Sequence, residues 1–77
     1  MRIVLLGLSH DIVETWAREL GYERGSYVEV TADRPALARG LRPDRVIVVG
    51  PVRAPLDAPI DYFEAVGAPI EYKRTLP

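Results

Sequence analysis

Two runs of apolar residues predict the central strands of a sheet. The first lies within residues 2–8 and reads IVLLGL, and the second, residues 45–49, reads RVIVV. Because both faces of each run are apolar, we expect strands that are buried on both sides, as in parallel sheets. Residues 27–31 and 70–74 alternate between apolar and polar side chains, which indicates edge strands that are covered better on one side.

The first of three predicted helices covers residues 11–20. Its apolar residues recur at helical spacing: Ile12, Val13, Trp16, Ala17 and Leu20. Asp11 is the predicted N-cap, with Glu14 as its capping-box partner, and Gly21 is the predicted helix stop.

Two shorter helices are expected further along the chain. The second covers residues 34–39, with Thr31 or Asp33 as its cap. The third covers residues 58–66 and takes Asp57 as its cap.

Alternating strands and helices predict an α/β fold with a parallel sheet and right-handed crossovers. Two apolar strands flanked by two half-polar strands give the strand order 2-1-3-4, in a minimal flavodoxin-like or Rossmann-like domain that spans residues 1–77. In this topology the first helix alone covers one face of the sheet. We therefore expect hydrophobic area over the third and fourth strands that no segment of the same chain covers.

The length of the chain points to self-association. A chain of 77 residues buries only about 60% of its unfolded surface, and a core of this size supplies roughly 3–5 kcal/mol. The chain has no cysteine and one histidine, so neither disulfides nor a structural zinc site can add stability. We therefore expect a homodimer.

Charge and hydropathy narrow the classes of partner. The net charge is −1, from 10 basic and 11 acidic residues, so we expect no nucleic-acid binding and no attraction to an anionic membrane. The longest apolar stretch is far shorter than the roughly 18 residues of a membrane span, and no signal-peptide cleavage site follows it. The expected location is the cytoplasm.

In the predicted sheet, the loops after the first and third strands meet at the carboxyl edge. This would bring Ser9, His10 and Asp11 close to Arg53. A nucleophile, a base and an anion clamp could be built from these groups. The alternative, which we favour, is that Ser9 or Asp11 caps the helix while His10 and Arg53 are solvated, so no catalytic residue is assigned.

An anion site at this switch point is a second interpretation. Gly7, Ser9, His10 and Arg53 would surround the anion near the first turn of the helix. The glycine pattern of nucleotide-binding loops is missing, however, and Asp11 would repel an anion. One histidine among scattered carboxylates also offers no metal site. We expect neither a cofactor nor a metal.

Arginines and aromatic residues are the remaining candidates for an interaction surface. The arginines cluster around the second predicted helix: Arg34, Arg39, Arg42 and Arg45. Acidic residues lie among them, so a solvated charged face is expected rather than a nucleic-acid patch. Tyr62 and Tyr72 are the aromatic residues predicted to face a protein partner, because phenol groups suit interfaces that stay partly wet.

Three segments together resemble small uncharacterised Rossmann-like proteins of actinobacterial bacteriophages. They read RIVLLG at residues 2–7, WARELG at residues 16–21, and LRP at residues 41–43 leading into VIVVG. The resemblance implies a phage accessory protein that acts by binding, with a host protein as its target and the host cytoplasm as its location. It carries over no catalytic residue.

Two functions follow from the sequence. The first is a noncatalytic protein-interaction module that forms a homodimer. The second is a domain that binds a small ligand or nucleotide at the anion site described above.

Overall fold

The two apolar runs are the central strands of the sheet. In a computed structural model that describes residues 2–75, the elements are β1 (Ile3–Gly7), α1 (His10–Glu19), β2 (Val28–Thr31), η1 (Pro35–Ala38), β3 (Arg45–Val49), η2 (Ala54–Leu56), α2 (Asp57–Ala65) and β4 (Ile70–Lys73). The four strands are parallel and have the order β2-β1-β3-β4. The predicted strand order and direction are therefore confirmed.

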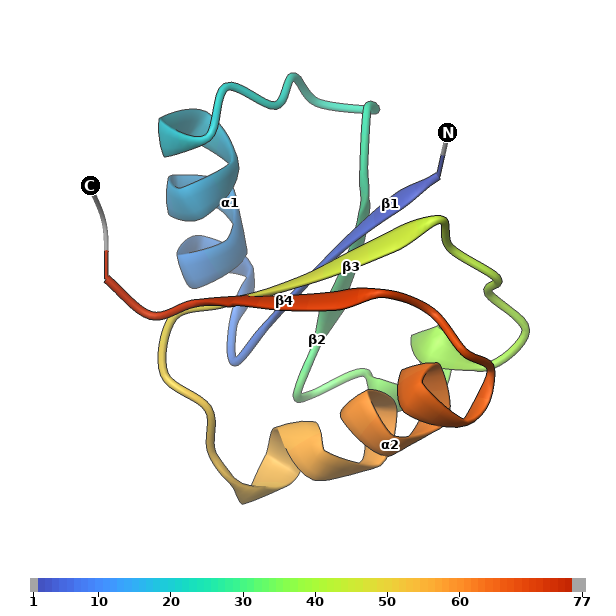
Figure 1. Cartoon of the computed structure of the whole chain (residues 1–77). Coiled ribbons are helices and arrows are strands. Elements are labelled where there is room, and N and C mark those ends of the chain that lie inside the picture. The colour runs from blue at the N-terminus through green and yellow to red at the C-terminus, as the bar shows by residue number, and fades with distance from the viewer. Residues whose placement is uncertain (1, 76–77) are drawn as a thin grey trace.

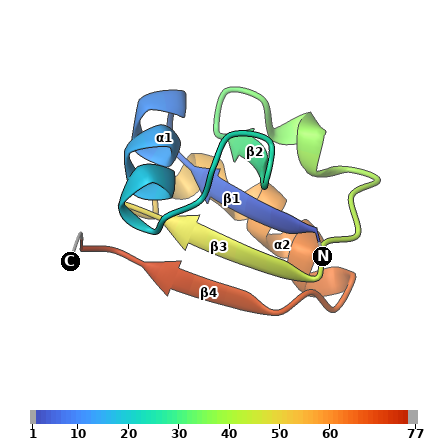
Figure 2. The same ribbon diagram turned by 90° about the horizontal axis from the view of Figure 1, so that it is seen from above.

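The helices lie on opposite faces of the sheet. Figure 1 shows α1 on one side of the sheet and α2 on the other, and Figure 2 looks down on the face with α1. In Figure 2, β4 forms the border of the sheet, and no helix covers β3 and β4 on this face. The prediction that α1 alone covers its side is thus confirmed.

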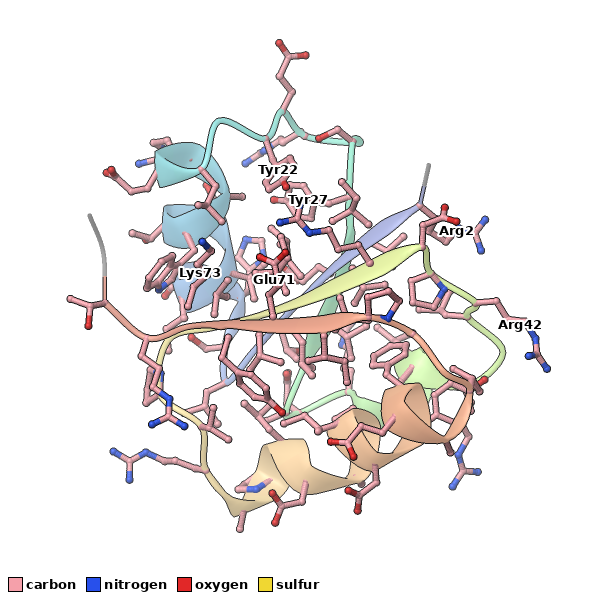
Figure 3. The ribbon with its side chains drawn as sticks, viewed as in Figure 1. Arg2, Tyr22, Tyr27, Arg42, Glu71 and Lys73 are labelled. Carbon is pink, nitrogen blue, oxygen red and sulfur yellow. The ribbon has the colours of Figure 1, made fainter. Side chains whose placement is uncertain are left out.

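The face that carries α1 is apolar only near the helix. Its buried side chains are Leu5, Val13, Trp16, Ala17, Ile47 and Val49. We expected hydrophobic area over β3 and β4 here, and that expectation is wrong. Ile47 and Val49 are 1% and 0% exposed, and Figure 3 shows Glu71 and Lys73 of β4 pointing to this side. The open part of the face is charged.

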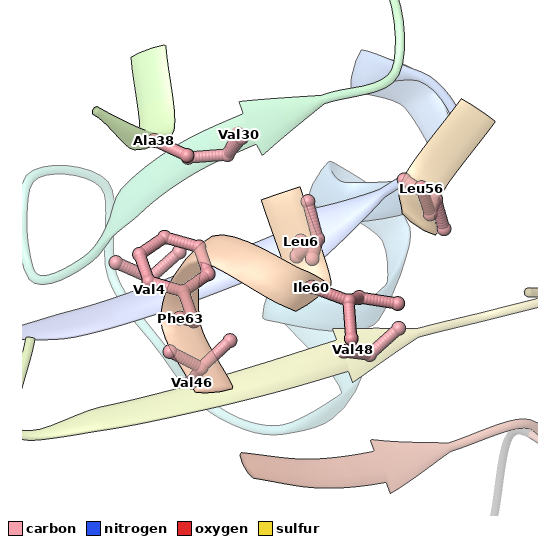
Figure 4. Close-up of a cluster of buried hydrophobic side chains, with 9 residues drawn as sticks. All are labelled: Val4, Leu6, Val30, Ala38, Val46, Val48, Leu56, Ile60 and Phe63. Atoms are coloured by element: carbon pink, nitrogen blue, oxygen red, sulfur yellow. The ribbon is translucent and has the colours of Figure 1, made fainter. Parts of the chain in front are cut away.

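The opposite face holds the larger cluster of buried side chains. Its members are Val4, Leu6, Val30, Ala38, Val46, Val48, Leu56, Ile60 and Phe63, shown in Figure 4. Phe63 on α2 is fully buried above the strands. Both faces of the central strands are therefore closed by apolar packing, as the two apolar runs predict.

The prediction of three helices is wrong, because the structure has two α-helices in the described part of the chain. The expected second helix is the short 3₁₀ helix η1, in which Pro35 stands in the first turn. Neither Thr31 nor Asp33 caps it, because the Thr31 hydroxyl donates to the Asp33 carboxylate instead. The segment between Pro35 and Gly40 is too short to offset the free-energy cost of nucleating an α-helix.

The cap of α1 is one of the two residues that we expected there, whereas the cap of α2 differs from the expected one. Ser9, not Asp11, is the N-cap of α1, and its hydroxyl accepts a hydrogen bond from the amide of Ile12 at 3.3 Å. Asp57 is the first residue of α2 rather than its cap, because η2 runs directly into the helix. Gly21 ends α1 as predicted, with a φ of 81° that favours glycine. In residues 2–75, no helix is long and apolar enough to span a membrane.

Candidate functional site

The loops after β1 and β3 lie side by side at the carboxyl edge of the sheet, as predicted. Asp11, at the start of α1, and Pro51, just after β3, line the same pocket, which has a volume of about 540 Å³. The pocket is lined by Asp11, Ile12, Thr15, Trp16, Gly50, Pro51, Arg74 and Thr75. None of the four residues that we predicted around an anion belongs to this lining.

Two of those four residues serve the packing of α1. The Ser9 hydroxyl is used as the helix cap. Gly7 lies where the helix approaches the sheet, since a Cβ at this position would come within 2.8 Å of Val13 Cγ2 and 3.3 Å of Val49 Cγ2. A close helix contact therefore accounts for Gly7, without any ligand.

His10 is directed to carboxylates. Its Nδ1 atom lies 2.7 Å from Glu29 Oε1 on β2, and its Nε2 atom lies 2.8 Å from Glu14 Oε2 on α1. The hydrogen bond and charge of Glu29, with a smaller contribution from Glu14, raise the pKa of His10 above its ordinary value. A charged His10 is thus already compensated by these two carboxylates.

Glu14 is the centre of a small charged network. Its carboxylate lies 3.4 Å from Arg18 Nη2 and 3.5 Å from Arg24 Nη2. The two arginines are exposed and Glu14 is half-buried, so the network joins surface elements and does not enclose a ligand.

Arg53 stands before η2 and is exposed. Within residues 2–75 it makes no ion pair and no side-chain hydrogen bond. The four predicted anion-site residues therefore have separate environments: a packing contact, a helix cap, a histidine between carboxylates and a solvated arginine.

Sequence patterns alone did not reveal the pocket residues Trp16 and Arg74. Trp16 follows the apolar period of α1 and was assigned to the core, which its 5% exposure supports. Arg74 is the last residue of the predicted edge strand, residues 70–74. Their convergence depends on the third dimension, because the loop after β3 and the end of β4 meet the second turn of α1 only in the folded chain.

The two tyrosines predicted to face a partner have different surroundings. The Tyr62 hydroxyl accepts a hydrogen bond from the amide of Gly40 at 2.9 Å and donates to the carbonyl of Leu41 at 3.5 Å. Tyr62 therefore joins α2 to the segment after η1. Tyr72, on β4, is 47% exposed and makes no side-chain hydrogen bond within the described residues.

The outer edge of β4 is a second candidate site. The Val46 amide donates a hydrogen bond to the Pro69 carbonyl at 2.8 Å, and the Gly50 amide donates to the Lys73 carbonyl at 2.7 Å. These bonds belong to the pairing of β3 with β4. Since main-chain groups alternate in direction along a strand, the amide and carbonyl of Ile70 and Tyr72 point outward. No strand of the described chain pairs with this edge.

Charged side chains border this edge on the face that carries α1. The Arg45 guanidinium donates to Glu71 Oε1 at 2.9 Å, so Arg45 belongs to an ion pair between β3 and β4. Lys73, two residues from Glu71 on the same face, has no ion pair within residues 2–75.

Residues 2–75 contain no group of three His, Asp or Glu side chains placed to hold a metal ion. In comparisons with known proteins, no protein-family model matches the chain, and no curated protein and no solved structure matches it either.

Proposed function

We propose that the protein is a noncatalytic protein-interaction module that forms a homodimer by pairing β4 with β4 of a second copy in the antiparallel direction. The observation that carries this proposal is the free outer edge of β4, whose side chains are complementary to themselves. An unpaired edge strand offers a row of main-chain donors and acceptors to another strand. Eight strands would then form one continuous sheet.

The main-chain groups favour one register. Tyr72 has its amide and carbonyl on the free edge. A two-fold axis at Tyr72 would let the two Tyr72 residues exchange a pair of hydrogen bonds. The same axis would place Ile70, the other outward-facing residue of β4, opposite residue 74 of the second copy. The register thus uses every outward group of the strand.

Side-chain charges favour the same register. With the axis at Tyr72, Glu71 lies opposite Lys73 of the second copy, and Lys73 lies opposite its Glu71. These positions form the non-hydrogen-bonded pairs of the ladder, in which side chains come closest. Opposite charges in such pairs contribute roughly 0.2–1 kcal/mol each. On the other face, the two exposed Tyr72 rings would lie next to each other.

Such an interface is small, so the dimer should be weak. A single pair of four-residue strands belongs to the low end of specific interfaces, below about 1,200 Å². We therefore expect dissociation at micromolar or higher concentrations and a melting temperature that rises with protein concentration. A host protein, the target class that the phage resemblance implies, would be a competing or additional partner for the same edge.

Charge-reversal variants test the proposal by analytical ultracentrifugation from about 10 µM to 1 mM. The wild type should move from the 8.6 kDa mass of one chain toward twice that mass. Lys73→Glu places like charges opposite each other and should remain a monomer, although it keeps the Arg45–Glu71 pair. Glu71→Lys should also remain a monomer.

A mixture of the two variants is the decisive sample. Lys73→Glu and Glu71→Lys carry complementary charges at both positions, so the mixture should form a heterodimer that neither variant forms alone. This result cannot come from misfolding, because both chains must keep their β4 edge. A wild type that stays monomeric at 1 mM, or a Lys73→Glu variant that dimerises like the wild type, would overturn the proposal.

A further inference from the structure

The pocket at the carboxyl edge of the sheet has the size and lining of a small-molecule site. Its volume is about 540 Å³, within the range of about 300–1,000 Å³ typical of such sites. It lies where ligands bind in open parallel sheets, outside the carboxyl ends of the strands. Its walls come from three segments that are distant in sequence: α1, the loop after β3 and the segment after β4.

The base of the pocket is apolar and contains one hydrogen-bond donor. Ile12, Trp16 and Pro51 provide the apolar surface. Trp16 is only 5% exposed, but its Nε1 atom is neither sealed from solvent nor hydrogen-bonded to a group within residues 2–75. An indole N–H that reaches solvent and has no protein partner can donate to water or to a ligand. The indole N–H is thus available to an acceptor on a bound molecule.

Gly50 keeps this donor accessible. Its φ of 78° disfavours other residues, and a Cβ here would lie 2.9 Å from Ile12 Cγ2 and 3.6 Å from Trp16 Nε1. Any side chain at position 50 would therefore crowd the indole edge that faces the pocket.

Residues of opposite charge line the pocket. Asp11 comes from the first turn of α1, and Arg74 comes from the segment after β4. They do not pair with each other. Asp11 disfavours an anion and Arg74 disfavours a cation, whereas a molecule that carries both charges suits both residues.

We infer that this pocket binds a zwitterionic amino acid with an apolar side chain, of the size of leucine or phenylalanine. Asp11 receives the ammonium group and Arg74 the carboxylate. The apolar side chain packs on Ile12 and Pro51, and the N–H of Trp16 donates to a ligand oxygen. This site differs from the predicted anion site, and its lining contains none of the β4 side chains Glu71, Tyr72 and Lys73 that the proposed dimer would bring together.

Trp16 is the only tryptophan, so its indole N–H gives a single resonance in a ¹H–¹⁵N NMR titration. Leucine or phenylalanine should shift this resonance in a saturable way. N-acetyl-leucine lacks the ammonium group and leucinamide lacks the carboxylate, so each should bind at least about tenfold more weakly. Glycine, which has no side chain to pack, should bind more weakly as well.

Variants of Asp11 and Arg74 test whether these residues bind the two charged groups of the ligand. Asp11→Asn and Arg74→Gln remove exposed charges without touching the core, and each should weaken leucine binding about tenfold or more. Arg42→Gln, which changes an arginine outside the pocket, is the matched control and should bind like the wild type. Lys73→Glu should also bind like the wild type, which separates this site from the proposed dimer edge.

Three results would overturn the inference. The first is the absence of a saturable shift with up to about 50 mM leucine or phenylalanine, a concentration well above a millimolar Kd. The second is equal affinity for leucine, N-acetyl-leucine and leucinamide. The third is leucine binding by the Asp11→Asn and Arg74→Gln variants that equals binding by the wild type.

Discussion

His10 joins the first turn of α1 to β2 through a contact of 2.7 Å between its Nδ1 atom and Glu29 Oε1. The residues are 19 positions apart, so this contact is tertiary and bridges the two elements that follow and flank β1. The other ring nitrogen, Nε2, contacts the Glu14 carboxylate. The imidazole therefore lies between two carboxylates, and both favour its charged form.

The first prediction concerns the pH dependence of stability. The pKa of His10 is raised in the folded state, chiefly because its ring N–H donates a hydrogen bond to the Glu29 carboxylate. A raised folded pKa gives a stabilisation that is fully present below the unfolded value of about 6.5 and is lost as the pH rises through the folded pKa. The stability advantage of the wild type over His10→Gln should therefore be larger near pH 6 than near pH 8.5.

Because His10 is the only histidine, its ring protons titrate without overlap in ¹H NMR. The midpoint should lie above the ordinary value and should fall in Glu29→Gln. A midpoint at or below about 6.5 would contradict the contact geometry, whatever the melting curves show.

The second prediction concerns acid stability. The Thr31 hydroxyl donates to the Asp33 carboxylate, and this bond lowers the pKa of Asp33. A lowered folded pKa gives a stabilisation that is present above the unfolded value and is lost as the pH falls through the folded value. Thr31→Val keeps the shape of the side chain but removes the donor.

Denaturant unfolding at a series of acidic pH values should show a flatter dependence for Thr31→Val than for the wild type. Asp33→Asn, which removes the titrating group, should flatten the curve in the same way. Parallel curves for wild type and Thr31→Val would mean that the bond contributes nothing to folding.

The third prediction concerns Gly7, which lies under α1. A Cβ at this position would approach Val13 Cγ2 at 2.8 Å, so Gly7→Ala should cost about 1–3 kcal/mol through overpacking. Val13→Ala alone should cost about 2 kcal/mol through lost burial and a cavity. In the double variant, the new methyl group occupies part of the space that Val13 leaves.

The two costs should therefore not add. Equilibrium unfolding of the wild type, both single variants and the double variant should give a coupling of roughly 0.5–3 kcal/mol in favour of the double variant. Simple additivity would show that the helix moves away from Gly7, and that the close approach is not what requires glycine.

Hydrophobic pattern alone was enough to predict the sheet. β3 matches the predicted residues 45–49 without change, and the strand order follows from which runs are apolar on both faces. These features depend on burial, which dominates the free energy of folding and is visible in the residue types. The expectation of exposed hydrophobic area over β3 and β4 was wrong for a related reason, because the alternation of side chains along β4 puts Glu71 and Lys73 on the open face.

Local competition explains the errors in helix type and capping. Thr31 and Asp33 bond to each other rather than to the start of a helix, and Ser9 and Asp11 are both good caps only two positions apart. Residue type does not decide between such alternatives. The pocket was missed for a different reason, because Trp16 and Arg74 belong to patterns that usually mean core and solvent.

The last prediction separates the two tyrosines. Tyr62→Phe removes a hydroxyl that bonds to Gly40 and Leu41, and it leaves the Gly40 amide without this acceptor. We expect a loss of about 0.5–1.5 kcal/mol in the free energy of unfolding. Tyr72→Phe is the matched control, because its hydroxyl has no protein partner within residues 2–75 and its ring is 47% exposed. It should stay within about 0.5 kcal/mol of the wild type.

Denaturant unfolding at one fixed protein concentration keeps the contribution of self-association the same for both variants. Equal losses in both variants would place Tyr72 in a bonded environment like that of Tyr62. Because Tyr72→Phe keeps the aromatic ring at the β4 edge, it should also leave the proposed dimer intact, whereas Tyr62→Phe changes a contact inside one chain. Both tyrosines are predicted from the sequence to face a partner, but the Tyr62 hydroxyl should affect folding, whereas the Tyr72 hydroxyl should affect neither folding nor assembly.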